Sequence, residues 1–183
     1  MKRKFKDFIN FLRFRRPIGL KMGKGASIRW PYRLMNRSRI SLGDRTIIRE
    51  SARIEAIQNY GGRQYSPSIE IGDGVYIGSE VYIAAVQRLV IESGCVLSDH
   101  VYLSDSAHGY DPSKGPLMQQ PLESKGPIHI GPDCFLGYRT FVAPGVRLGR
   151  NCIVGAHSVV TRSFPDYSTI AGVPARLIRS HTP

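Results

Sequence analysis

The sequence predicts an all-β chain wound as a parallel β-helix, and three regularities of spacing carry that prediction. An aliphatic residue recurs at every sixth position over three blocks of the chain. A small residue usually follows it directly, and another modest side chain stands four positions after it. The aliphatic positions are Ile71, Ile77, Ile83, Ile91, Leu97, Leu103, Ile130, Leu136, Val142, Leu148, Val154 and Val160.

A six-residue period excludes an amphipathic helix, because a helix of 3.6 residues per turn would spread these aliphatics around its axis. It fits a short strand followed by a corner, with three such units closing one coil of roughly 18 residues. The aliphatic and the residue four places later then face inward. Cys95, Cys134 and Cys152 fall on that second inward position, so we expect buried, reduced thiols rather than metal ligands.

The β-helix is expected to span residues 28–165, with a closing segment at 166–183. Two stretches without periodicity interrupt it, at 59–67 and at 109–129. Long irregular loops that leave a rigid scaffold are often functional. Earlier, less regular coils are indicated by Ile28, Leu34, Ile40, Leu42, Ile48 and Ile54.

Residues 1–27 form a basic amphipathic segment for which we expect a short helix. Residues 1–24 contain nine Lys or Arg and a single acid, Asp7, which gives a net charge of +8 within a chain whose total is +12. The segment could cap the open end of the β-helix or attach the protein to an anionic surface. Its apolar residues at helical spacing are Phe5, Phe8, Ile9 and Leu12.

The amino-acid composition narrows the classes of protein to which the chain could belong. Hydrophobic residues make up 42% of the 183 residues, which suits a globular domain, and no apolar run is long enough to cross a bilayer. Charged residues interrupt every apolar run at the basic start, so we expect no signal peptide. We therefore expect a cytoplasmic protein, with the basic segment allowing contact with the inner face of the membrane. No nucleic-acid-binding motif is present, so no nucleic-acid partner is expected.

His108 is the strongest candidate for chemistry, because it is the last residue before the long loop. Histidine changes its charge near neutral pH, so a neutral imidazole there could take a proton from an alcohol. We expect the other four histidines to be surface residues without evident partners. They are His100, His129, His157 and His181.

The stretch SDSAHGYDPSKGPLMQQP around His108 resembles the segment before the long loop in sugar O-acetyltransferases of the galactoside, maltose and polysaccharide type. These enzymes belong to the hexapeptide-repeat acyltransferase superfamily, and the resemblance covers residues 69–179. It implies a left-handed coil, a homotrimer and acetyl-coenzyme A (acetyl-CoA) as donor, with no metal required. It also implies that His108 is the general base that deprotonates a hydroxyl of a carbohydrate acceptor.

Four further residues are candidates for orienting His108 or binding the acceptor. Asp105 lies three positions before it and Asp111 three positions after it, and Tyr110 lies between Asp111 and the histidine. Arg147 shares the outward column of His108 if the 18-residue register continues through the loop, and could hold an anionic group of the acceptor. For each of the two aspartates, a solvated loop carboxylate is an equally good interpretation.

Residues 130–179 resemble the C-terminal coils of the same superfamily, which implies a site for the pantetheine arm and phosphates of coenzyme A (CoA). Phe135 stands where the family often has tryptophan, and the ending AGVPARLIR resembles the segment whose basic side chains meet the phosphates. The small residues among these positions could equally be corner formers. The implied CoA-binding residues are Phe135, Gly137, Tyr138, Ala156, Thr161, Arg162, Arg176 and Arg179.

Three other functions are alternatives to sugar O-acetylation. Serine acetyltransferases share the coils but carry a long helical domain ahead of them. Carbonic anhydrases of the γ class need three histidine ligands, two of them five residues apart, and no histidine pair here has that spacing. A non-catalytic β-helix binding protein would need neither the His108 loop nor the AGVPAR closure.

The two uses of the basic segment can be separated by truncation. Deleting residues 1–20 is expected to abolish binding to anionic liposomes, because each Lys or Arg near such a surface contributes about 1 kcal/mol. Activity on a small soluble acceptor should persist. Aggregation of the truncated protein, or loss of its thermal transition, would show instead that the segment caps the β-helix.

Overall fold

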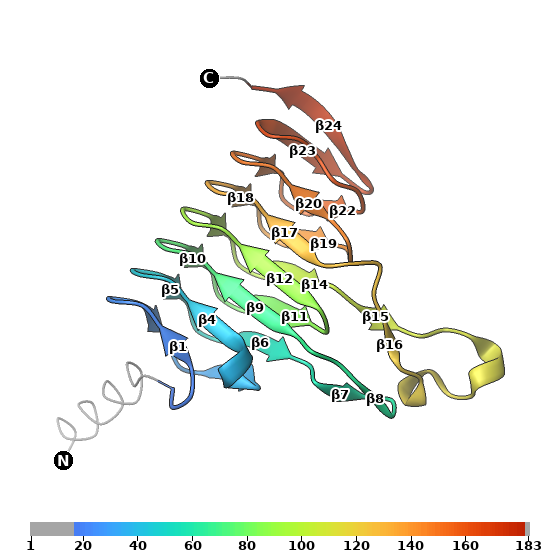
Figure 1. Cartoon of the computed structure of the whole chain (residues 1–183). Coiled ribbons are helices and arrows are strands. Elements are labelled where there is room, and N and C mark those ends of the chain that lie inside the picture. The colour runs from blue at the N-terminus through green and yellow to red at the C-terminus, as the bar shows by residue number, and fades with distance from the viewer. Residues whose placement is uncertain (1–16, 182–183) are drawn as a thin grey trace, which may run out of the picture.

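The computed structural model describes residues 17–181 and shows a left-handed parallel β-helix, as the spacing and the resemblance predicted. Successive coils stack along one axis from the blue N-terminal end to the red C-terminal end (Figure 1). The helix predicted around Phe5–Leu12 lies outside the described residues. Within residues 17–181, no helix is long and apolar enough to cross a membrane.

Three sheets form the walls of the coil, and each coil contributes one strand to each wall. Sheet A contains β1 (Lys21–Met22), β4 (Ile40–Leu42), β9 (Ser68–Ile71), β12 (Arg88–Ile91), β17 (Ile128–Ile130) and β20 (Arg147–Leu148). Sheet B contains β2 (Ser27–Ile28), β5 (Ile47–Ile48), β10 (Tyr76–Ile77), β13 (Val96–Leu97), β18 (Phe135–Leu136), β21 (Ile153–Val154), β23 (Ser168–Gly172) and β24 (Ala175–Ser180). Sheet C contains β3 (Tyr32–Met35), β6 (Ala52–Ala56), β11 (Tyr82–Ala85), β14 (Tyr102–Ser104), β19 (Phe141–Val142) and β22 (Val159–Val160).

The aliphatic residues predicted to face inward stack on one another from coil to coil, and these ladders of side chains form the core. Strands pair in parallel with the aliphatics in register, as in the pairing of Ile77 with Leu97 and of Leu97 with Leu136. All three of these side chains are fully buried. The cysteines face inward as expected, and the backbone N–H of Cys152 donates to the sulfur of Cys134 at 3.3 Å.

The spacing of eight between Ile83 and Ile91 has a simple structural cause. Strand β12 runs over four residues, and Leu89 faces the core together with Ile91. The two extra residues therefore add a second inward side chain instead of disturbing the coil. The indicated early coils are also present, because β2, β3 and β4 follow one another between Ser27 and Leu42. A 3₁₀ turn, η1 (Arg37–Arg39), precedes β4.

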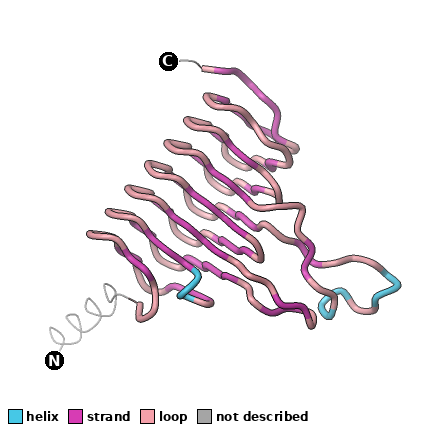
Figure 2. The backbone as a smooth tube through the Cα atoms, in the orientation of Figure 1, coloured by secondary structure: helices cyan, strands magenta, loops and turns pink. Residues whose placement is uncertain are grey.

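Both irregular stretches leave the coil at the same corner, where sheet C passes to sheet A (Figure 1). The first forms a hairpin of β7 (Asn59–Tyr60) and β8 (Arg63–Gln64). The second forms a hairpin of β15 (Ala107–His108) and β16 (Leu122–Glu123), with two 3₁₀ turns, η2 (Pro112–Lys114) and η3 (Leu117–Gln119), at its far end. In Figure 2 these turns are the cyan segments farthest from the coils.

The two hairpins pack against each other although a full coil separates their roots. The Tyr65 hydroxyl donates to the Leu122 carbonyl at 3.0 Å. Gly61 has a φ of +54°, and a Cβ atom there would lie 2.5 Å from the carbonyl carbon of Gln120. Only glycine tolerates both this backbone conformation and this approach, so the tandem Gly61–Gly62 allows the hairpins to meet.

Asp105 joins the root of the longer hairpin to the corner of the preceding coil. Its carboxylate oxygens accept the backbone N–H groups of Val86 and Gln87, each at 2.8 Å, and the residue is fully buried. Burial raises the pKa of this carboxyl, while the backbone N–H donors act in the opposite direction. At other corners an aspartate carboxylate also accepts a backbone N–H of the neighbouring coil, but the bond is exposed to solvent. Asp99, for example, accepts the backbone N–H of Ser79 at 2.7 Å.

Replacing Asp105 with alanine is expected to destabilise the fold by about 1–3 kcal/mol, because the buried N–H of Val86 loses its acceptor. Asp99→Ala removes one similar bond at an exposed corner, where water can replace the carboxylate, and should cost less. Thermal unfolding of the two variants side by side measures the difference. Equal losses for both would contradict the role assigned to burial at Asp105.

Candidate active site

A cavity of about 330 Å³ lies where the outer face of sheet C meets the two hairpins. Sheet C contributes its floor through Arg53, Tyr82 and Tyr102. The hairpins contribute walls, among them Tyr60 and His108. The cavity is therefore assembled from segments that only the stacking of the coils brings together.

His108 occupies the wall formed by strand β15. Its backbone pairs antiparallel with Leu122, which fixes the direction in which the strand presents the imidazole. The ring meets the Tyr60 ring edge-on, with centroids 5.3 Å apart and the planes at 63°. Among residues 17–181 the imidazole has no hydrogen-bond partner, and the exposed side chain lines the cavity.

The acidic residues expected to orient His108 are engaged elsewhere. Asp105 is buried in its corner bonds. Asp111 accepts the backbone N–H and the hydroxyl of Ser113 at 2.9 and 2.6 Å and pairs with Lys114, and these bonds lower the pKa of its carboxyl. It caps the turn η2. Tyr110 is 77% exposed and does not line the cavity.

Arg147 lies on a different wall from His108, which corrects the expected shared column. It is on β20 in sheet A, directly paired with His129. The 18-residue register places residues correctly only while the coil continues. His108 stands on a hairpin strand that has already left the coil, so the extrapolation fails there.

The residues expected to bind CoA fall into groups on the last coils. On the outer face of sheet B, Phe135 pairs with Ile153, Ile153 with Thr169, and Thr169 with Arg179. Tyr138 and Ala156 are exposed at the corner between sheets B and C. The four paired residues on sheet B form one continuous outer strip over strands that are far apart in sequence.

Thr161 and Arg162 follow β22 and are exposed at the corner from which, two coils earlier, the His108 hairpin leaves. The Arg162 guanidinium lies over the Phe164 ring at 5.1 Å. Arg176 is exposed on β24, in register with Ala171.

Gly137 has a packing explanation that does not involve a ligand. A Cβ atom at this position would lie 2.7 Å from the backbone nitrogen of Ala156 in the next coil. The stacking of the coils therefore requires glycine here, and the corner-forming interpretation accounts for it.

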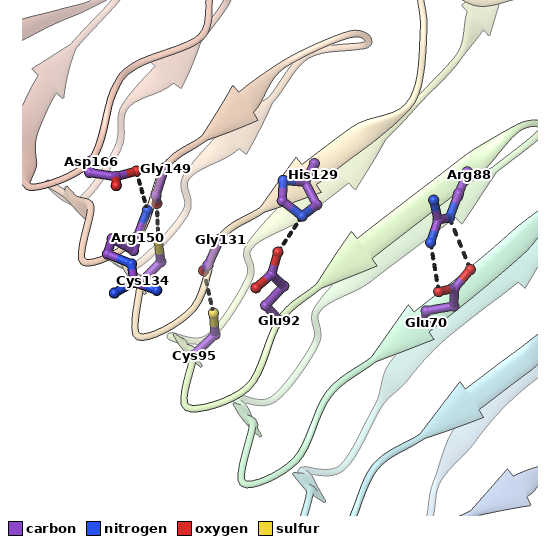
Figure 3. A network of polar contacts seen from close by, with 10 residues as sticks. All are labelled: Glu70, Arg88, Glu92, Cys95, His129, Gly131, Cys134, Gly149, Arg150 and Asp166. Carbon is purple, nitrogen blue, oxygen red and sulfur yellow. Dashed lines mark hydrogen bonds and ion pairs between the residues drawn. The ribbon is translucent and has the colours of Figure 1, made fainter.

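All four histidines expected to be unpaired surface residues have partners, and that of His181 is the Thr169 hydroxyl, 3.2 Å from its Nδ1. His129 contacts Glu92 at 2.5 Å on sheet A (Figure 3). His100 lies 3.7 Å from Glu80, and the rings of His100 and His157 flank Tyr138 edge-on at 5.2 and 5.4 Å. Side chains at equivalent corners of successive coils stack directly on one another. The spacing of the repeat alone does not reveal these contacts between outward-facing side chains.

No cluster suited to a metal ion is found in the described part of the chain: no three His, Cys, Asp or Glu side chains converge within residues 17–181.

The residues of the cavity floor were not predicted from the sequence. Arg53, Tyr82, Tyr102 and Phe141 each stand immediately before an inward aliphatic, so they face outward along sheet C. Three aromatic rings in one outward column are an available signal in the repeat. Their relation to His108 could not be found, because it depends on how the hairpins fold back.

Comparison with known proteins agrees with this architecture. The family model described as bacterial transferase hexapeptide (six repeats) matches residues 127–162. Among solved structures, the N-acyltransferase AntD from Bacillus cereus, in complex with dTDP and 3-hydroxybutyryl-CoA, superposes with a TM-score of 0.73. It shares 18% identity and covers 100% of this chain and 89% of its own. PerB from Caulobacter crescentus, in complex with CoA and GDP-perosamine, gives a TM-score of 0.58 at 23% identity, over 83% of this chain and 56% of its own.

Curated relatives are more similar in sequence. "Probable acetyltransferase Rv3034c" of Mycobacterium tuberculosis is 32% identical over 64% of this chain, which spans only 39% of that longer protein. "Putative lipopolysaccharide biosynthesis O-acetyl transferase WbbJ" of Escherichia coli is 31% identical, over 84% of this chain and 78% of its own length. "Putative colanic acid biosynthesis acetyltransferase WcaF" of the same organism is 30% identical, over 82% and 75%. Because the last two matches extend over most of both chains, this chain belongs to the hexapeptide-repeat family of acetyltransferases.

Proposed function

We propose that the protein transfers an acetyl group from acetyl-CoA to a hydroxyl of a carbohydrate, with His108 as the general base. The observation that carries the proposal is the position of His108. An exposed imidazole without a hydrogen-bond partner among residues 17–181 lines a cavity of about 330 Å³ that two hairpins enclose. This volume lies within the range of small-molecule sites, about 300–1,000 Å³.

The reaction requires one proton to move at the acceptor. His108 takes the hydroxyl proton as the oxygen attacks the carbonyl carbon of the thioester. The carbon–sulfur bond then breaks, the acetyl group stays on the sugar oxygen, and the CoA thiolate leaves and recovers a proton. Direct transfer of this kind needs no covalent enzyme intermediate, in agreement with the burial of Cys95, Cys134 and Cys152 in the core.

The names of the relatives support the choice of substrates. WbbJ and WcaF are named as acetyltransferases of lipopolysaccharide and colanic acid biosynthesis. AntD and PerB have been solved with a CoA compound and a nucleotide or nucleotide sugar. These relatives favour an acyl-CoA donor and a glycan acceptor. The solved relatives include N-acyltransferases, so an amino sugar is the alternative acceptor that an assay should include.

A homotrimer is part of the proposal. Within one chain, Tyr138 and Ala156 lie at one corner of sheet C while the hairpin of His108 leaves from the other corner. A neighbouring copy could bring its own donor strip against the His108 cavity and complete the site. We also propose a cytoplasmic location, where acetyl-CoA is made available to the enzyme.

His108→Ala is expected to fold and bind CoA but to lose about 10²–10⁴-fold in acetyl transfer, the usual cost of removing a general base. Thiol release from acetyl-CoA, in the presence of a panel of neutral and amino sugars, measures the reaction. His129→Gln is the matched control, because His129 lies on sheet A outside the cavity and glutamine can still bond to Glu92. Near-normal turnover by His108→Ala would refute the base assignment.

Replacing Arg176 and Arg179 together with alanine should raise the KM for acetyl-CoA more than it lowers kcat. Phosphate contacts far from the reacting carbon stabilise the bound ground state and the transition state equally. Arg37→Ala with Arg39→Ala removes two arginines of η1, on the coils of the opposite end, and controls for the loss of charge. An unchanged KM in the first pair would exclude these arginines from the donor site.

A further inference from the structure

The floor of the cavity carries a guanidinium that is held rigidly in place. Arg53 donates from Nε to one oxygen of Glu55 at 2.6 Å and from Nη2 to the other at 2.9 Å. The same guanidinium lies over the Tyr82 ring, 4.9 Å from its centroid. A bidentate ion pair and a stacked ring together fix both the position and the plane of the group. The Arg53 side chain is nevertheless 48% exposed.

The carboxylate that holds Arg53 is hidden from solvent. The Glu55 side chain is 3% exposed, and it also accepts the Tyr82 hydroxyl at 3.1 Å and lies 3.5 Å from Arg33. Arg33 is 67% exposed. Arg33 lies beside the cavity and does not line it, so the guanidinium that a ligand in the cavity meets is that of Arg53. The three side chains together carry a net charge of +1.

Arg53 also keeps donors that are not used within the protein. Its Nη1 makes no hydrogen bond with any residue of 17–181, and Nη2 has a second N–H. A guanidinium edge of this kind matches the oxygens of a carboxylate or a phosphate. Because neighbouring groups already hold it in place, binding an anion costs little further side-chain entropy.

Next to this edge lies an aromatic surface. The Tyr82 and Tyr102 rings have centroids 4.7 Å apart, and Tyr102 stacks on Phe141 at 5.3 Å. Tyr102 is 40% exposed and lines the same cavity as His108. Burial raises the pKa of both tyrosines, so both hydroxyls stay protonated at neutral pH. Because Tyr82 and Phe141 cover the two faces of the Tyr102 ring, Tyr102 presents its edge to the cavity, and its hydroxyl can donate or accept a hydrogen bond there.

We propose that Arg53 binds an anionic substituent of the acceptor, a uronic acid carboxylate or a phosphate on the glycan, while the edge and hydroxyl of Tyr102 contact a sugar ring. The proposal rests on the proposed function and names the class of its acceptor: an acidic carbohydrate. Tyr60 and His108 on the hairpin walls line the same cavity. Arg53 acts as a specificity-determining residue and takes no part in proton transfer.

Equilibrium binding to the full-length protein, measured by ligand-observed NMR, tests the inference independently of turnover. The probes are p-nitrophenyl β-D-glucuronide, which carries a carboxylate, glucose 1-phosphate, which carries a phosphate, and neutral p-nitrophenyl β-D-glucoside. At least one anion should bind about tenfold more tightly than the glucoside, as expected for a charge-assisted hydrogen bond. The tighter anion identifies the source of the charge.

Arg53→Met should remove this preference, and Arg53→Lys should retain part of it, because a lysine keeps the charge but loses the planar fork. Arg88→Met is the matched control. Arg88 makes the same bidentate contact, to Glu70 at 3.0 Å for both bonds, on sheet A outside the cavity (Figure 3). If Arg53→Met fails to fold because Glu55 is left without its partner, the double variant Arg53→Met/Glu55→Gln replaces it.

Equal or undetectable binding of both anions and the glucoside by the unaltered protein would overturn the inference. So would a preference for the anion that survives unchanged in Arg53→Met or in the double variant. Failure of the proposed function gives a different result, since an anion that binds through Arg53 without being acetylated would support the subsite and contradict the transfer reaction. Conversely, acetylation of the neutral glucoside with no dependence on Arg53 would support transfer and reject the subsite.

Discussion

Coil-on-coil pairing is the constraint on which everything else in this molecule depends. The strands are only two to six residues long, too short to be stable alone. The strands of the coils exist because parallel partners lie about 4.8 Å above and below them. The inward ladders of Ile, Leu and Val fix the register, because a slip by one residue would turn every aliphatic outward. Glycine is imposed where adjacent corners touch, as Gly137 shows against Ala156. Chain can be added only at corners, where no ladder is interrupted.

That restriction explains where the site lies. Both hairpins leave at the passage from sheet C to sheet A, and the corner of the intervening coil separates their roots. Asp105 binds the root of the second hairpin to that corner. The hairpins can then lean across the outer face of sheet C and enclose a space above its aromatic column. Sheet C and the two hairpins together form a cavity that neither contains alone.

The sequence predicted the coils well, because an aliphatic at every sixth position has one structural meaning and because burial repeats with the period. It also identified the two loops and His108 at the edge of one of them. It did not identify the surroundings of the imidazole. Asp105 and Asp111 lie close to His108 in sequence and bond elsewhere, whereas Arg53 and Tyr60 lie some 50 residues away and face the same cavity. Hairpins obey no repeat, so the contacts they make are fixed only by tertiary packing.

The outer strip from Phe135 to Arg179 crosses four strands, one per step. Successive strands are about 4.8 Å apart, so the length of the strip is a whole number of strand spacings. Evolution can lengthen or shorten it only by whole coils of roughly 18 residues, since a partial coil would break the ladders. The distance between the aromatic residue at one end and the basic residue at the other can therefore change only in steps of one coil. A ligand spanning them must suit one of a few discrete lengths, and side-chain substitution can adjust the fit only within a single step.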